Sequence, residues 1–165
     1  MDSAFWGVIG TIVGAAASIG TTWLTNRNAA ALQSSAKAAE QLENRRAFQR
    51  QTLVELQDAF HDAIRHISVA YLADRHAHAN GIAWGKNILP DGLAEQIRLA
   101  NRQVMLLVER VHDDSLRKTI KGLMAQANSV GDSGSVDEAE ARLDHVTMQS
   151  IAAIERTGET LRSLY

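Results

Sequence analysis

The feature that most constrains this chain is a run of 24 residues without a charged side chain, from Ser3 to Asn26. As an α-helix rising about 1.5 Å per residue it would be about 36 Å long, enough to cross a hydrocarbon core of about 30 Å. Trp6 and Trp23 would then lie about 25 Å apart, near the two aromatic belts of a membrane span. The pattern predicts a transmembrane helix over residues 3–26, with Trp6 and Trp23 at the membrane interfaces.

Two other interpretations fit an uncharged N-terminal stretch. A secretory signal peptide has a basic start, whereas this chain begins Met-Asp-Ser. In a buried helix of a bundle, each interior glycine would cost about 1 kcal/mol of helix stability. The stretch contains Gly7, Gly10, Gly14 and Gly20. Both interpretations stay open, but a single membrane span is the preferred prediction.

Small residues recur every four positions in this stretch, at Gly10, Gly14, Ser18 and Thr22. We call these four residues the small-residue ridge. Such a ridge lets two helix backbones approach closely, which is how membrane helices pack. It predicts a homo-oligomer, or docking on a partner membrane protein, through the Gly-rich span. The alternative is that glycine is simply common in membrane helices.

The distribution of basic residues predicts an orientation. Asp2 precedes the uncharged run, whereas Arg27, Lys37, Arg45 and Arg46 follow it. Because basic residues favour the cytoplasmic side, we expect a single-pass protein of the cell inner (plasma) membrane, in contact with membrane lipid. Its N-terminus would lie outside, and its C-terminal domain would be cytoplasmic.

A periodic pattern follows the uncharged run. Positions spaced alternately by three and four run through Leu32, Ser35, Ala39, Leu42, Arg46, Gln49, Leu53, Leu56, Phe60, Ala63, Ile67 and Ala70. This spacing predicts one helix that continues to about residue 80. Polar Arg46 and Gln49 interrupt the apolar register. We therefore expect a weak, coiled-coil-like helical stalk over residues 27–52 and a helical bundle over residues 53–165.

The rest of the chain divides into short loops and amphipathic helices. Residues 80–92 hold three glycines and the sole proline, and predict a loop whose Trp84 packs on the bundle. The apolar stripes expected to face the core are Leu93, Ile97, Ala100, Val104, Leu107 and Val111, then Leu116, Ile120 and Leu123, and finally Leu143, Val146, Ile151, Ile154, Gly158, Leu161 and Tyr165. Met105, Leu106 and Met148 lie off these stripes, which indicates either a second apolar contact or wide burial.

Two helix starts carry capping signals. Asp113 or Asp114 can cap a short third helix, and Ser135 with Glu138 forms a capping box before the last helix. Helices joined by short connections pack antiparallel. The predicted fold class is therefore all-α: an N-terminal transmembrane helix that continues into a long stalk helix, packed distally in an antiparallel three- to four-helix bundle.

The layout resembles a known group of proteins. The Gly-rich span ending in TTWLTNR, the stretch RRAFQRQTLVELQDAFHDAIR and the stretch VHDDSLRKTI resemble short actinobacterial single-span membrane proteins of unknown function. The specific motif runs from Arg45 to Leu56, while the likeness in layout covers most of the chain. The resemblance implies a membrane-tethered cytoplasmic helical domain and supplies no catalytic residues.

The histidines and carboxylates do not predict a metal site. Asp58 with His61, and Glu109 with His112, have the carboxylate-x-x-His spacing of di-iron bundles. At 100° per residue, however, Asp58 and Glu109 lie opposite the apolar stripes of their helices, so these side chains cannot share a metal in the core. His76 and His78 are better explained as solvated residues near a helix end.

No catalytic chemistry is predicted either. The sequence contains no Gly-x-Ser-x-Gly, phosphate-binding loop, dinucleotide fingerprint or His-Glu-x-x-His motif, and no cysteine. The 17 basic and 19 acidic residues are not segregated, so no nucleic-acid surface is expected. We expect that the protein binds no cofactor and is not an enzyme. The preferred prediction is a non-enzymatic membrane protein that presents a cytoplasmic helical bundle as an interaction or scaffolding module. The alternative is a holin-like or toxin-like effector whose membrane helix oligomerises into a pore.

Overall fold

The computed structural model describes the backbone of residues 2–165, and the side chains from Gly14 onward except that of Ala16. Within residues 2–165 the chain forms four α-helices and no strand: α1 (Asp2–Ala79), α2 (Leu93–Val108), α3 (Asp114–Asn128) and α4 (Val136–Arg162). The all-α prediction and the expected helical bundle are confirmed. The chain comprises two compact units, Met1–Arg45 and Arg46–Tyr165, which we describe separately.

The first unit consists of the N-terminal part of α1. From Gly14 to Arg45 every described side chain is exposed, including large apolar ones such as Leu32, which is 71% exposed. Helix formation in this stretch is favoured by alanine and by Leu, Gln, Glu, Lys and Arg, all good helix formers. Because this unit buries none of the side chains that the structure describes, intrinsic propensity is the only visible source of its helicity.

The predicted transmembrane helix over residues 3–26 is not supported. Across the described residues, no helix is long and apolar enough to cross a membrane. This finding contradicts the predicted inner-membrane location, single-pass topology and orientation. The physical reason is that an uncharged run is not the same as an apolar run. Gly20, Thr21, Thr22 and Thr25 dilute the few large apolar residues in the described part of the stretch, and charges begin at Arg27.

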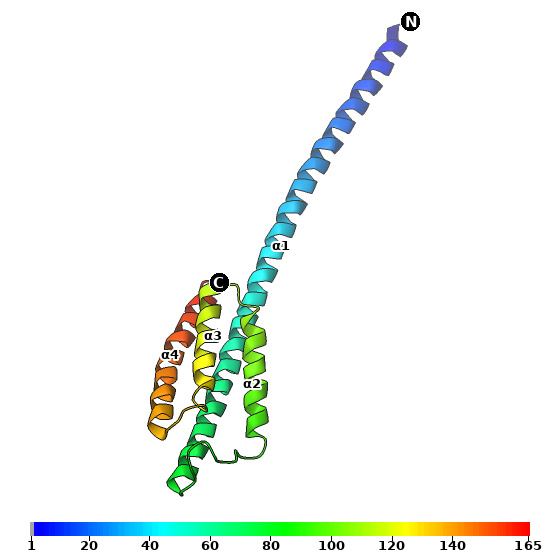
Figure 1. The fold of residues 1–165 in the computed structure, drawn as a ribbon. Coiled ribbons are helices and arrows are strands. Elements are labelled where there is room, and N and C mark those ends of the chain that lie inside the picture. Colours follow the sequence, from blue (N-terminus) through cyan, green and yellow to red (C-terminus); the bar gives the residue numbers. More distant parts are fainter. Residues whose placement is uncertain (1) are drawn as a thin grey trace. The chain divides into compact units, whose positions relative to one another are not determined.

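The second unit is a bundle in which successive helices run antiparallel. Figure 1 shows α2, α3 and α4 alongside the C-terminal part of α1. At one end of the bundle, Gln49 Nε2 donates to the carbonyl oxygen of Arg110 (2.9 Å), and Gln49 Oε1 accepts from the backbone N–H of His112 (2.9 Å). At the other end, Trp84 Nε1 donates to the carbonyl oxygen of Ser133 (2.9 Å). These contacts join the α2–α3 link to the start of the unit and the α1–α2 loop to the α3–α4 link.

Local side-chain caps explain where α3 and α4 begin. Asp113 Oδ1 accepts from the backbone N–H groups of Ser115 (2.8 Å) and Leu116 (2.9 Å), so Asp113 is the N-cap of α3. Ser135 Oγ accepts from Glu138 N (3.3 Å), which makes Ser135 the N-cap of α4. Glu138 Oε2 accepts from the N–H of Gly134 (2.8 Å), one residue before the cap. Both predicted starts are confirmed.

The bundle has two adjoining groups of buried side chains. The larger, which we call the proximal core, centres on Phe60, with an exposed fraction of 1%. Its other large members are Leu53, Leu56, Val104, Leu107, Val108, Val111, Leu116, Ile120, Leu123 and Met124. The smaller, which we call the distal core, consists of Ile67, Tyr71, Ala127, Val130, Ala139 and Val146. Burial of this apolar area is the main favourable term in folding the unit.

The buried face of α4 differs from the predicted one. Ile151 is 54% exposed and Tyr165 is 87% exposed, although the apolar pattern placed both toward the core. The fully buried positions of α4 are instead Ala139, Val146, Ser150, Ala153 and Thr157. Four of these five are small residues or carry a hydroxyl. Thr157 Oγ1 donates to the carbonyl oxygen of Ala153 (2.7 Å), which satisfies that buried hydroxyl.

Candidate functional site

The residues predicted for helix packing lie in the first unit, and the structure places part of them. Gly14, Ser18 and Thr22 are exposed on α1, whereas Gly10 lies outside the residues whose surroundings are described. A Cβ added at Gly14 would meet nothing within 4 Å. Thr22 Oγ1 donates to the carbonyl oxygen of Ser18 (2.8 Å) within the helix. This part of the small-residue ridge is therefore an accessible surface that no other element of the described residues covers.

The two tryptophans predicted at membrane interfaces belong to the same unit. The side chain of Trp6 lies outside the described part. Trp23 is 62% exposed, and the guanidinium carbon of Arg27 lies 5.5 Å from its ring centroid. A cation over an exposed indole contributes about 0.5–1 kcal/mol. The contact gives Trp23 a local partner on the helix surface.

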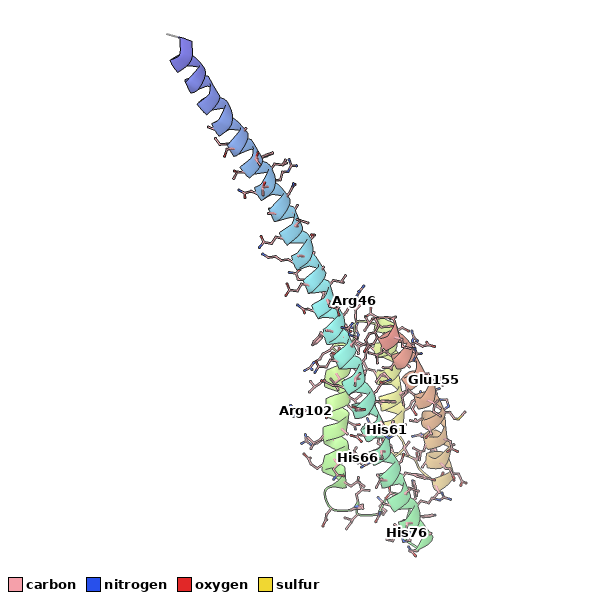
Figure 2. All side chains as sticks on the ribbon, turned by 180° about the vertical axis from the view of Figure 1, so that it is seen from behind. Arg46, His61, His66, His76, Arg102 and Glu155 are labelled. Carbon is pink, nitrogen blue, oxygen red and sulfur yellow. The ribbon has the colours of Figure 1, made fainter. Side chains whose placement is uncertain are left out.

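The histidine and carboxylate pairs all face solvent. Asp58, His61, Glu109 and His112 are exposed, as the helical count predicts. Glu109 forms an ion pair with Lys121 (2.5 Å), which lowers the pKa of Glu109. Figure 2 shows that His61 is well separated along α1 from His76, which lies near the end of the helix. In the part of the chain that the structure describes, no group of three or more His, Asp or Glu could hold a metal ion.

A pocket of about 270 Å³ lies at the distal end of the bundle. It forms where the end of α1, the α1–α2 loop, the start of α2 and the end of α3 meet. Its lining residues are Ile67, Ala70, Tyr71, Asp74, Trp84, Gly85, Asn87, Leu89, Ile97, Ala127, Asn128, Val130 and Gly131. We call it the Tyr71–Trp84 pocket. Its walls combine apolar side chains with several polar groups, and small-molecule sites also combine the two.

The aromatic wall of this pocket is held from both sides. The rings of Tyr71 and Trp84 make an edge-to-face contact, with centroids 6.1 Å apart at 64°. His78 makes a second edge contact with Trp84 at 6.1 Å. The bond from Trp84 Nε1 to Ser133 fixes the indole against the α3–α4 link. Trp84 packs on the bundle, as predicted, and it also lines the pocket.

One lining residue of the pocket, Tyr71, carries a buried polar atom without a hydrogen-bond partner. Among the described side chains, three buried polar atoms have no hydrogen-bond partner: Tyr71 Oη, Asn101 Oδ1 and Ser133 Oγ. Tyr71 lines the pocket, and Asn101 Nδ2 donates to Oδ1 of the lining residue Asn128 (2.7 Å). The backbone of Ser133 holds Trp84. An unpaired buried polar group costs about 1–3 kcal/mol, so the Tyr71 hydroxyl gains from any water or ligand that pairs with it.

Charged groups of both signs lie near Tyr71, where Arg75 forms an ion pair with Glu140 (3.9 Å). Burial, followed by the nearby charge of Glu140, raises the pKa of the Tyr71 phenol, while Arg75 opposes both effects. Asp144 adds to the increase. The phenol therefore stays protonated at neutral pH. Asp74 is the only lining residue with a formal charge at neutral pH.

Periodicity alone did not reveal this pocket. Tyr71 directly follows Ala70, the last position of the periodic stripe in α1, and Trp84 lies in a loop. No sequence pattern connects the two residues. An aromatic residue in a glycine-rich loop was the one available signal.

Comparison of the chain with protein-family models, curated proteins and solved structures found no match. The resemblance to actinobacterial single-span proteins stays a prediction.

Proposed function

We propose that this protein is a non-enzymatic interaction module, in which the first unit pairs with the same helix of a second copy. The observation that supports the proposal is the exposure of every described side chain from Gly14 to Arg45, including Ile19, Leu32 and Leu42. In proteins, a helix gains most of its stability by packing an apolar face against other elements. Exposed large apolar side chains along one helix therefore favour a binding role for that helix.

The register of the apolar residues supports helix pairing. The three-four spacing that includes the buried Leu53, Leu56 and Phe60 of the bundle extends back along the sequence through Leu42, Ala39, Ser35 and Leu32. In the bundle the side chains at these positions face other helices. A three-four repeat keeps such positions on one face of a helix. Leu32, Ser35, Ala39 and Leu42, which we call the exposed stripe, have no partner that the described chain supplies.

A second copy is the occupant that the composition favours. It carries the same stripe, so one symmetric contact would cover the apolar side chains of both chains. The charged residues from position 25 to 45 are Arg27, Lys37 and Arg45 against Glu40 and Glu43, a net charge of +1 per copy. Two such helices repel only weakly.

The test is the oligomeric state of the purified full-length chain, measured by light scattering and sedimentation over a range of concentrations. We expect a mass twice that of the chain, falling to the monomer mass on dilution. The double variant Leu32→Asp, Leu42→Asp should be monomeric throughout, because two buried charges per helix oppose pairing.

The matched control is Gln33→Asp, Gln41→Asp, which adds the same charge at neighbouring positions outside the exposed stripe. It should associate as the unmodified chain does. Thermal unfolding of the bundle should be unchanged in both double variants. A monomer at every concentration, or a dimer that survives the changes at Leu32 and Leu42, would overturn the proposal.

A further inference from the structure

The Tyr71–Trp84 pocket is independent of the helix-pairing surface and has its own chemical character. Its lining includes two aromatic rings, six aliphatic side chains, two amides and one carboxylate, that of Asp74, but no lysine or arginine. A site for a carboxylate or phosphate would need basic side chains or a cluster of backbone donors. The lining therefore excludes small anions as its preferred ligands.

A positive charge would find two complementary features in the pocket. Asp74 is half-buried, where a charge pair is weakened less by solvent than at an open surface. The faces of aromatic rings attract cations within about 6 Å of the ring centroid.

We propose that the Tyr71–Trp84 pocket binds a small organic cation, an ammonium group attached to an apolar or aromatic body. The ammonium pairs with the Asp74 carboxylate, and the apolar body lies against Ile67, Ile97 and the aromatic wall. The side-chain amides of Asn87 and Asn128 also line the pocket and can bind a polar substituent of the ligand.

The size of the pocket restricts the ligand further. A volume of about 270 Å³ lies just below the range of about 300–1,000 Å³ that is usual for ligand pockets. The ligand is therefore a compact molecule with one ring or a short alkyl chain. Peptides and nucleotides are too large to be enclosed.

The test compares two probes that share a ring and differ in charge, phenethylammonium and 2-phenylethanol, on the full-length protein. Binding is followed by calorimetry and by the indole N–H resonance of Trp84, assigned with Trp84→Phe. We expect phenethylammonium to shift this resonance and to bind at least tenfold more tightly than the alcohol. Asp74→Asn should abolish the tenfold preference, whereas the exposed carboxylate variant Asp58→Asn on the same helix should keep it.

A second variant tests the location without changing charge. Ala70→Leu fills part of the pocket, so it should weaken both probes at least tenfold while circular dichroism shows an unchanged helical fold. Equal affinity for the two probes would overturn the preference for a cation, as would a preference that survives Asp74→Asn. Absence of binding by either probe would show a pocket that holds only water and would overturn the proposal. If Asp74→Asn does not fold, the probe comparison and Ala70→Leu still decide the outcome.

Discussion

The two units of this chain share one helix but differ in what stabilises them. In residues 46–165, α1 contributes Leu53, Leu56 and Phe60 to a core supplied by four helices. In the first unit, Leu32 and Leu42 occupy the same register and are exposed. Identical spacing therefore has different consequences, depending on whether other helices lie beside it. Periodicity specifies which face of a helix can pack, while the rest of the chain decides whether it does.

The largest expected effect comes from truncating the same register in each unit. Phe60→Ala should destabilise the bundle by about 3–5 kcal/mol, because it leaves a cavity in the proximal core. Leu32→Ala should leave the denaturant midpoint of the bundle within error and reduce association instead. Urea unfolding by circular dichroism, together with sedimentation, measures both quantities. A large loss of bundle stability from Leu32→Ala would contradict the conclusion that the two units are stabilised differently.

Adding volume should have opposite effects in the two units. Ala153→Leu should destabilise the bundle by about 1–3 kcal/mol, because Ala153 is buried on α4 and the larger side chain does not fit. Ala39→Leu adds the same volume in the exposed stripe and should strengthen self-association without destabilising the bundle. The same two measurements apply. If Ala39→Leu weakened association, the exposed stripe would not be the pairing surface.

The cap of α3 provides a pH-dependent test within the bundle. Asp113→Ala should cost about 1 kcal/mol of stability at neutral pH, because two backbone N–H groups lose their acceptor. Hydrogen bonds from Leu116 and Ser115 lower the pKa of Asp113 in the folded state. A lowered folded-state pKa stabilises the fold above the unfolded-state value of about 3.9, and this contribution disappears as pH falls through the folded-state pKa.

The measurement is therefore urea unfolding of the unmodified chain and of Asp113→Ala at neutral pH and at successively more acidic pH. The two stabilities should converge in acid. Exposed Asp58→Asn is the control and should show little difference at either extreme. A difference that persisted at the most acidic pH would assign the effect to something other than the charged cap.

The smallest expected effect concerns one glycine in each unit. Gly20 on α1 and Gly122 on α3 lie in helix interiors, and an added Cβ would meet nothing within 4 Å at either position. Gly122→Ala should raise the unfolding free energy of the bundle by about 0.5–1 kcal/mol. Gly20→Ala should increase helix content without moving the bundle midpoint. A stabilised bundle from Gly20→Ala would indicate that the two units unfold together.

Helix boundaries in this chain were predictable because they depend on local chemistry. Asp113 and Ser135 accept bonds from backbone groups two or three residues away, and sequence spacing alone identifies such caps. The buried face of α4 was partly missed, because Ser150, Ala153 and Thr157 face inward where a pattern of large residues favours Ile151. Which face packs depends on the spacing between neighbouring helices, and the sequence does not reveal this spacing.

The remaining errors have two separate causes. The span prediction gave more weight to the absence of charge than to the hydroxyl and glycine content of the same stretch. The Tyr71–Trp84 pocket depends on tertiary structure, since its lining joins Tyr71, Trp84 and Gly131 across 60 residues of sequence. The periodic pattern allowed the burial of Tyr71 to be predicted. It did not allow the contact between Tyr71 and Trp84 to be predicted.

The loop that forms one wall of the pocket also has a consequence for how this protein can diverge. Gly85, at φ +69°, lines the pocket, and Gly92, at φ +79°, is the N-cap of α2. Side chains are strained in this left-handed region, so selection that maintains the pocket would resist change at both positions. Gly122, which has no such backbone constraint, is free to drift. Homologues that retain the pocket should therefore be recognisable by two glycines seven residues apart after an aromatic residue, even where the first unit has diverged beyond alignment.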